Sequence, residues 1–350
     1  TQMIRNETTN LSLYANYRLF KPEDEVKTIQ KTLNSRLFFD QNLAKNLVQW
    51  QTVYETSSGQ LPQQDFTYIE VEPGQGSFVW FDYNNNGIQE LEEFEIAQFQ
   101  DQATYIRVLL PNQVYIRTHQ NRLSQTLTLD PIRWQDSSNK SKLFLAHFYN
   151  QTSFLIDRKQ RNDGQEINLN PFQSNPENQL ALQSNFRNQL FFNRGKQHYT
   201  LSYSFLASEL KNVLSFGSIA QKGFTHQLNF THKIQQQWLL NFQFNFDNNK
   251  SESENYSSKN FELDQVLINP KISYLLDDNK RFDVFYQFQQ KENLINEKEN
   301  LEQHKFGVFA MINENTNASI SAEFNYFFNA FEGNTNTPVA YQMMEGLQSG

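Results

Sequence analysis

Residues 238–246 read WLLNFQFNF, and from Leu240 onward apolar side chains occupy the even positions while amides occupy the odd ones. Successive side chains of a β-strand point to opposite faces, so this alternation predicts a strand with one apolar and one polar face. The same period-two pattern recurs at residues 199–205, 282–288 and 318–326. We therefore expect the second half of the chain to form a series of long amphipathic strands.

The polar connections between these strands alternate in length. In chain order, the short turns and the long polar segments between them are expected at residues 193–196, 208–223, 235–237, 247–260, 277–280, 291–302 and 313–317. Tight turns on one side and longer loops on the other are typical of outer-membrane β-barrels. Strands of about ten or eleven residues, tilted by about 45°, would rise about 25 Å, which matches the apolar band of such barrels.

The same rhythm extends into the first half of the chain. Further strands are expected at residues 11–19, 28–39, 46–57, 122–133, 142–156 and 179–192, with a short turn at 136–141 and a long outer loop at 157–178. The total is about thirteen strands, whereas single-chain bacterial barrels have an even number. Because the chain also begins at Thr1 without a signal peptide, we interpret it as an internal fragment that does not close a barrel alone.

The predicted fold class is therefore all-β: a long antiparallel meander of amphipathic strands that forms part of a transmembrane β-barrel, with an extracellular insert. Residues 1–58 and 121–350 would supply the barrel strands. Residues 59–120 would form the insert, since they follow a strand that rises toward the outer side and precede one that descends.

The composition agrees with a barrel and excludes other classes of protein. The chain contains 32 Phe and 15 Tyr, yet its mean hydropathy is −0.71. A barrel accommodates both features because apolar side chains face lipid while Asn, Gln, Ser and Thr line the lumen; a low-GC genome would produce a similar bias. The net charge of −8 argues against a nucleic-acid partner, which requires a surplus of Lys and Arg. The absence of cysteine excludes disulfides and thiolate metal sites.

One motif in the predicted insert points to a specific chemistry. Residues 82–93 read DYNNNGIQELEE, with oxygen-bearing side chains at loop positions one, three, five, nine and twelve and Gly87 at position six. Calcium accepts roughly six to eight hard oxygen ligands, and glycine at position six permits the sharp turn of such a loop. The expected calcium ligands are the side chains of Asp82, Asn84, Asn86, Glu90 and Glu93 and the carbonyl oxygen of Ile88.

The motif resembles EF-hand calcium loops, especially the short extracellular ones without full flanking helices. It departs from them at Gln89, where an apolar residue is usual, and residues 74–81 read as a turn entering a strand rather than as a helix. We therefore expect calcium binding without a rearrangement of helices. The alternative is an Asn-rich turn followed by a solvated acidic face.

Residues 74–97, with Gly74-x-Gly76 before the loop and Phe94 to Ala97 after it, resemble large, mostly uncharacterised outer-membrane proteins of flavobacteria and related Bacteroidota. The barrel of the type 9 secretion translocon is a more distant likeness. The resemblance implies an outer-membrane location. We expect membrane lipid and other outer-membrane or secretion components as partners. It implies no catalytic residues.

The sequence contains no convincing catalytic set. Ser137 and Lys140 have Ser-x-x-Lys spacing but lie in a predicted polar turn, and His226 and His232 would lie about 20 Å apart on one strand face. We predict a non-enzymatic outer-membrane component with a structural or transport and export role and a calcium-stabilised insert on the cell surface. The alternative is a secreted or surface-attached soluble β-protein that binds glycans or acts as an adhesin.

Overall fold

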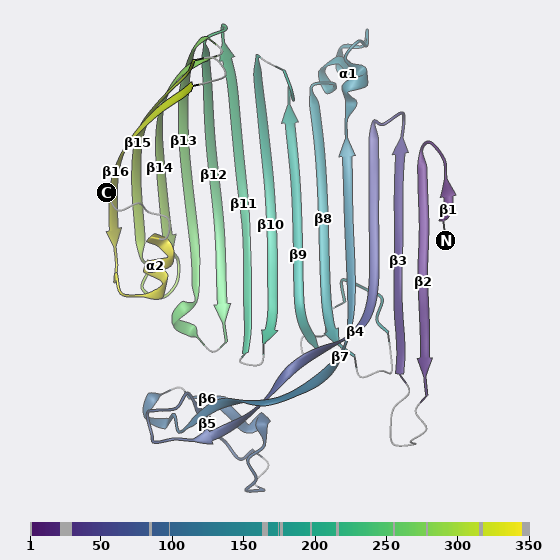
Figure 1. Cartoon of the computed structure of the whole chain (residues 1–350), viewed down its shortest axis with the longest axis vertical. Coiled ribbons are helices and arrows are strands. Elements are labelled where there is room, and N and C mark those ends of the chain that lie inside the picture. The colour runs from purple at the N-terminus through teal and green to yellow at the C-terminus, as the bar shows by residue number, and fades with distance from the viewer. Residues whose placement is uncertain are drawn as a thin grey trace.

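The strands predicted from the alternating pattern pair with one another in chain order. The structure, a computed structural model, describes all residues except 1, 22–29, 84–85, 98, 163–166, 174, 176–177, 197, 215–216, 255, 278, 315–317 and 345–350. Its main feature is one antiparallel sheet in the order β1-β2-β3-β4-β7-β8-β9-β10-β11-β12-β13-β14-β15-β16 (Figure 1). The predicted all-β antiparallel meander is therefore confirmed.

The strands on this path differ widely in length. Their bounds are β1 (Gln2–Arg5), β2 (Thr9–Phe20), β3 (Gln30–Leu43), β4 (Val48–Glu70), β7 (Tyr105–Leu129), β8 (Phe148–Arg161), β9 (Gln179–Phe192), β10 (Tyr199–Leu214), β11 (Gly217–Ile234), β12 (Trp238–Ser253), β13 (Phe261–Asp277), β14 (Lys280–Asn293), β15 (Asn300–Glu314) and β16 (Ala318–Glu332). Within the described residues, β1 and β16 each pair on one side only, so they form the two edges of an open sheet.

The two ends of the sheet carry different connections. Short turns such as residues 44–47 and 235–237 lie at the upper end in Figure 1, called here the turn end. The hairpin of β4 and β7 leaves the sheet from the lower end, called here the insert end. The long connections lie at the insert end with one exception, but the β10–β11 connection at that end spans only residues 215–216, so the predicted alternation is present in part.

The strands are longer at the insert end than predicted, and this part of the prediction is wrong. Residues 208–223 were expected to form a loop, but β10 and β11 pair without interruption from Tyr199↔His232 to Leu214↔Gly217. The predicted loops at residues 247–260 and 291–302 likewise begin as strand. The prediction placed the end of each strand where the polar side chains begin. The backbone hydrogen bonds between neighbouring strands continue past these side chains.

One connection at the turn end is also larger than predicted. The end of the strand predicted at residues 122–133 is a 3₁₀ turn, η3 (Pro131–Trp134). A helix, α1 (Lys140–Leu145), covers the end of the expected short turn and the start of the following predicted strand, and β8 begins only at Phe148. Asn139 caps α1, since its side-chain oxygen accepts hydrogen bonds from the backbone N–H of Ser141 (2.9 Å) and Lys142 (3.4 Å).

The insert is an extension of the sheet that ends in a small β-module. The predicted boundaries at residues 59 and 120 fall inside the β4–β7 ladder, which runs from Val48↔Leu129 to Glu70↔Tyr105 with a register shift between Gln64 and Phe66. Beyond it, β5 (Phe78–Trp80) pairs with β6 (Phe94–Ile96), with the 3₁₀ turns η1 (Leu91–Glu93) and η2 (Gln100–Gln102) beside them. The aromatic rings of Tyr68 and Phe94 stack with centroids 4.0 Å apart, which holds the module to the hairpin.

Two short helical elements lie at the insert end of the last strands. They are the 3₁₀ turn η4 (Ser257–Lys259) and the helix α2 (Pro338–Met344). Among the described residues, no helix is both long and apolar enough to cross a membrane.

Candidate functional site

The first functional feature is the difference between the two faces of the sheet. Residues directly opposite each other on neighbouring strands share a face, so the register defines each face. One row across the sheet consists, in order, of His232, Leu240, Ile272, Val284, Val308 and Phe324. A second row nearer the insert end consists of Leu228, Phe244, Ile268, Phe288, His304 and Phe328. This face of the sheet, on which β10 to β16 carry the apolar rows, is called here the apolar face.

The apolar face has a sharp border at the insert end. The first charged or amide side chains past it, from β10 to β15, are Glu209, Lys222, Asn248, Asp264, Gln290 and Glu302. Beyond this border cross-strand ion pairs form, including Glu209 with Lys222 at 2.9 Å. On β11 the apolar band runs from Phe224 to Ile234, roughly 34 Å of strand or about 24 Å of height at a 45° tilt.

Aromatic side chains gather along both margins of this band. Near the insert end, the ring centroids of Phe205 and His226 are 4.8 Å apart and those of Phe288 and His304 are 5.2 Å apart. Near the turn end, Phe148 and Phe192 are 5.0 Å apart and Trp238 and Tyr274 are 4.8 Å apart. Outer-membrane barrels carry such aromatic girdles at both interfaces of their apolar band. The alternation along single strands did not predict these girdles. Aromatic side chains of different strands align only through the register between neighbouring strands.

The apolar face is interrupted by amides on β8 and β9. Asn188 donates hydrogen bonds to Thr152 Oγ1 at 2.7 Å and to Asn150 Oδ1 at 3.3 Å, on neighbouring positions of the same face. Each polar group thus has a partner within the sheet, which lowers the cost of placing it in an apolar medium.

The opposite face, called here the polar face, is rich in amides and carries a buried charge cluster. On β12 it presents Asn241, Gln243 and Asn245. On β13 and β14, the Asp283 carboxylate is buried and lies 3.0 Å from Lys271 Nζ and 2.6 Å from Arg281 Nε. Charged side chains are energetically unfavourable in lipid but are common beside water, so this face suits an aqueous surrounding.

Helix α2 packs on the polar face near the insert end. Val339 and Met343 are buried against Leu263 of β13 and Leu301 of β15. At the C-terminal end of α2, Lys291 Nζ donates a hydrogen bond to the carbonyl oxygen of Met343 at 2.8 Å. A cation is favourable there because the helix dipole is negative at its C-terminus.

Glu299 fixes the other end of α2. Its carboxylate accepts hydrogen bonds from Thr337 Oγ1 at 2.9 Å and Asn293 Nδ2 at 2.7 Å, and Thr337 Oγ1 in turn accepts the N–H of Ala340 at 3.0 Å. Although burial raises the pKa of Glu299, these hydrogen bonds outweigh it and leave the pKa below its ordinary value. Thr337 followed by Pro338 is a helix-start signal that sequence reasoning could have used to find α2.

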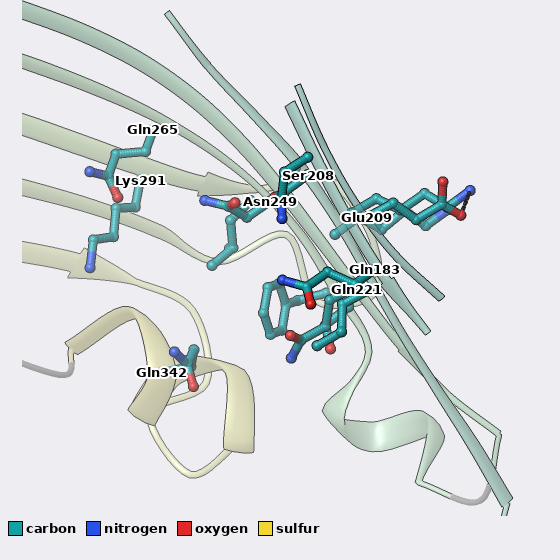
Figure 2. Close-up of a pocket in the computed structure, with 16 residues that line it drawn as sticks. Gln183, Ser208, Glu209, Gln221, Asn249, Gln265, Lys291 and Gln342 are labelled. Carbon is teal, nitrogen blue, oxygen red and sulfur yellow. Dashed lines mark ion pairs between the residues drawn. The ribbon is translucent and has the colours of Figure 1, made fainter. Parts of the chain in front are cut away.

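A cavity of about 490 Å³ with a mixed polar and apolar lining lies between α2 and the polar face. Figure 2 shows Gln342 of α2 on one side, with Gln221, Asn249, Gln265 and Lys291 of the sheet on the other. Side-chain amides both donate and accept hydrogen bonds, so this lining suits a polar solute. The volume is in the range of small-molecule sites, about 300–1,000 Å³.

The predicted calcium loop is ordered by its own hydrogen bonds. Asp82 accepts the N–H of Asn86 at 3.1 Å through Oδ1 and that of Gly87 at 2.9 Å through Oδ2. Asn86 Oδ1 accepts the N–H of Ile88 at 2.6 Å. Gly87 has φ +69°, a left-handed conformation that favours glycine. The predicted ligand Asn84 lies outside the described residues.

The remaining two predicted ligands have different surroundings. Glu90 is exposed, whereas Glu93 is only 3% exposed and accepts a hydrogen bond from Trp80 Nε1 at 2.9 Å through Oε2. Its other oxygen, Oε1, is buried and has no hydrogen-bond partner among the described residues. Gln89, the departure from the EF-hand pattern, donates to the Tyr105 hydroxyl at 2.9 Å and ties the loop to β7.

The structure does not bring the three carboxylates together. Among the described residues, no three His, Cys, Asp or Glu side chains form a group that could hold a metal ion. The predicted ligands therefore lie in one loop, but the side chains of Asp82, Asn86 and Glu93 accept hydrogen bonds from the protein and do not converge on one point.

Comparisons with known proteins give remote structural matches. No family model matches this chain, and neither does any curated protein. The matching solved structures include OmpT, an outer-membrane protein of Vibrio cholerae, folded in vitro, at 8% identity over 94% of this chain and 99% of that chain with a TM-score of 0.30. Its trimer form matches at 10% identity over 93% and 100% with a TM-score of 0.31. OmpT expressed in the outer membrane matches at 9% over 94% and 99% with a TM-score of 0.30. Similarity this low does not support an inference about function. Such an inference has to come from the surfaces of this chain.

Proposed function

We propose that this chain forms the wall of an outer-membrane β-barrel, with its apolar face toward lipid and its polar face toward an aqueous lumen. The apolar band carries this proposal: it crosses β10 to β16, has a charged border and is flanked by aromatic side chains. Phe244 and Ile268 lie opposite each other within the band, and no Lys, Arg, Asp or Glu lies on the band between Trp238 and Phe246. A soluble sandwich would need a second layer over so large an apolar area.

The polar face supports a role in the passage of hydrophilic solutes. Amides of β12 and the buried Asp283 cluster would meet water, and α2 would narrow the lumen on the insert side. The cavity beneath α2 would hold a neutral polar solute through Gln221, Gln265 and Gln342. The proposal includes no catalytic step, and it places the insert on the cell surface, where lipid and other outer-membrane or secretion components are the partners.

The test is reconstitution of the full chain into liposomes and planar bilayers. We expect the protein to float with the vesicles, to resist extraction by carbonate and to require detergent for solubilisation. In planar bilayers, we expect ion conductance that rises when Lys291→Ala and Glu299→Ala together release α2, with Lys305→Ala, on the same face but away from α2, as the matched control. A chain that remains in buffer without detergent would instead be the soluble adhesin or glycan-binding protein.

We also propose that the loop of residues 82–93 binds calcium and stabilises the insert. The supporting observation is the buried Oε1 of Glu93, which has no hydrogen-bond partner in the described part of the chain and lies beside a loop that already turns at Gly87. Asp82, Glu90 and Glu93 would supply charged oxygens, with Asn84, Asn86 and the Ile88 carbonyl as neutral ligands. Binding requires the three carboxylates to approach one another, so we expect weak affinity, with a Kd on the order of 10⁻⁴–10⁻³ M.

Calorimetry on the full chain tests this second proposal. Glu93→Gln should remove most of the calcium heat, whereas Glu92→Gln should retain it because position eleven of the loop is not a ligand. Magnesium should substitute poorly, since it requires compact octahedral geometry. If calcium gave no heat at millimolar concentration, or the two variants behaved alike, the loop would be an Asn-rich turn only.

A further inference from the structure

The acidic residues of the chain are concentrated in the insert. The whole chain carries 38 Asp and Glu against 30 Lys and Arg. Residues 59–120 alone contain nine Asp and Glu, whereas Arg107 and Arg117 are the only Lys or Arg residues in this range. In Figure 1 the module formed by β5 and β6 lies beyond the insert end of the sheet. The net charge of the chain therefore does not describe the charge of the polar face.

The polar face of β8 to β16 has the opposite balance of charge. The register between neighbouring strands places each side chain on one of the two faces. The basic side chains of the polar face on β8 and β9 are Lys159, Arg161 and Arg187. On β11 to β15 they are Lys233, Lys271, Arg281, Lys291 and Lys305. The acidic side chains on this face of the same strands are Asp157, Asp247, Asp283 and Glu323. Basic groups thus outnumber acidic ones.

The first strands of the sheet show the same excess of basic groups. On the polar face of β1 to β7 outside the insert, the basic side chains are Arg5, Arg18, Arg36 and Arg122, and the acidic ones are Asp40 and Glu55. Helix α2, which covers part of the polar face, contains no charged residue. Glu299, which holds the start of α2, offsets one of the cations. The excess of positive charge therefore extends over the whole polar face.

Most of these carboxylates are held by donors of the protein. Glu55 Oε1 lies 3.1 Å from Arg36 Nε, and Asp283 lies between Lys271 and Arg281 as described above. Asp157 Oδ1 accepts a hydrogen bond from Gln120 Nε2 at 2.7 Å. Glu323 Oε1 accepts one from Asn325 Nδ2 at 2.7 Å.

Several cations of the polar face have no such partner. In the part of the chain that the structure describes, no ion pair joins Lys159, Arg187 or Lys233 to a carboxylate. Arg187 is exposed and has Ser153 and Leu206 as its cross-strand neighbours. Fixed positive charge along a protein wall of low dielectric constant attracts anions and repels cations.

We propose that the lumen bordered by the polar face conducts small hydrophilic anions in preference to cations. The inference rests on the proposed function, in which the polar face borders an aqueous lumen, and it names the class of solute. The amides of this face add hydrogen-bond donors and acceptors without adding charge, so the preference comes from the excess of Lys and Arg.

Planar bilayers that contain the full chain test this preference. With KCl more concentrated on one side, the sign of the voltage at zero current reports whether chloride or potassium passes more easily. We expect a permeability ratio of chloride to potassium on the order of 3–10, because charged walls raise the local concentration of the attracted ion.

Charge reversals on the two sides of the sheet locate the effect. Arg187→Glu reverses a charge on the polar face without breaking an ion pair and should lower the ratio about twofold, and the addition of Lys159→Glu should lower it further. Lys211→Glu on the neighbouring strand β10 is the matched control. Lys211 lies on the outward side past the border of the apolar face, opposite Leu182 and Ala220, so this variant should leave the ratio unchanged.

The outcomes separate this inference from the proposed function. Conductance without preference, or with a preference for potassium, would overturn the anion preference while the barrel proposal stood. Equal changes in Arg187→Glu and Lys211→Glu would also overturn it, because the effect would then not come from the polar face. If Arg187→Glu did not insert, the ratio of the unaltered chain would still decide. A chain that inserted nowhere or gave no conductance would overturn both proposals.

Discussion

The turn end and the insert end of the sheet stop in different ways. Between β11 and β12 at the turn end, the apolar pattern and the backbone ladder end together at the pair Ile234↔Trp238. At the insert end, the apolar pattern stops at Phe224 and Phe246, but pairing continues to Ile219↔Ser253.

The difference shows that polarity and strand length are set by separate forces. Lipid requires apolar side chains, so the band ends where the apolar medium is expected to end. A ladder needs only backbone partners, and outside lipid it is supported by cross-strand polar pairs. Asn248 donates to Asp264 Oδ1 at 2.6 Å, and Lys250 lies 3.9 Å from Glu262. Strands can therefore project beyond the membrane as a polar rim.

The largest expected effect comes from a charge placed inside the band. Phe244→Arg should destabilise the inserted protein by about 2–4 kcal/mol, because Phe244 lies near the middle of the apolar face. Urea unfolding of the protein in vesicles, followed by gel mobility, measures the loss.

Two matched variants sharpen this prediction. Gln243→Arg, on the polar face of the same strand, and Asn248→Arg, on the same face past the border, should cost about 0–1 kcal/mol. Equal losses for Phe244→Arg and Asn248→Arg would mean that the border does not mark the edge of lipid.

The next effect concerns the packing of α2 at the insert end. Met343→Ala should weaken the docking of α2 by about 2 kcal/mol or more, since Met343 is fully buried against the Leu263–Leu301 cluster. Because the chain has no cysteine, spin labels at Gln342→Cys and Gln265→Cys can report the distance across the cavity. We expect a longer and broader distance distribution.

The control for this variant is Tyr341→Ala, because the Tyr341 side chain is 64% exposed on the same helix. It should leave the distance distribution unchanged. A similar broadening in both variants would show that α2 is not held by its buried side.

Acid should release the same helix by a smaller amount. The lowered pKa of Glu299 means that its contribution to docking is present above the ordinary value of 4.5 and is lost as pH falls below it through the folded-state pKa. The same pair of spin labels should therefore show α2 docked at pH 6 and partly released in strong acid. Glu299→Gln should remove this step, and an acid transition that persisted in that variant would assign it to another group.

The smallest effect belongs to the turn end. Gln235 has φ +55°, which L-residues adopt at a cost, so Gln235→Gly should stabilise the protein by up to about 1 kcal/mol. Gln236→Gly, next to it, should be neutral or slightly destabilising, since Gln236 is not among the described residues with positive φ. Unfolding midpoints of the two variants in the same vesicles provide the comparison, and identical midpoints would contradict it.

Several features of the candidate site were accessible from the sequence. The alternation at residues 238–246 is a property of neighbours along one strand, so it predicted the strand and its two faces without knowledge of the partner strands. The Asp82-to-Glu93 spacing predicted the loop and its turn at Gly87, while calcium binding there stays a prediction.

Only the tertiary structure decided where strands end, which aromatic rings align and where helices dock. The ladder from Ser208 to Gly223 depends on hydrogen bonds between two strands, and no side-chain pattern along one strand reports them. Likewise, Lys291 and Met343 are far apart in the chain and meet only because α2 returns to the polar face. The sequence by itself determined which side of each strand avoids water, because that depends on side-chain chemistry. The alignment of these sides into one band depends on register, which is a property of pairs of strands, and the cavity depends on the docking of α2.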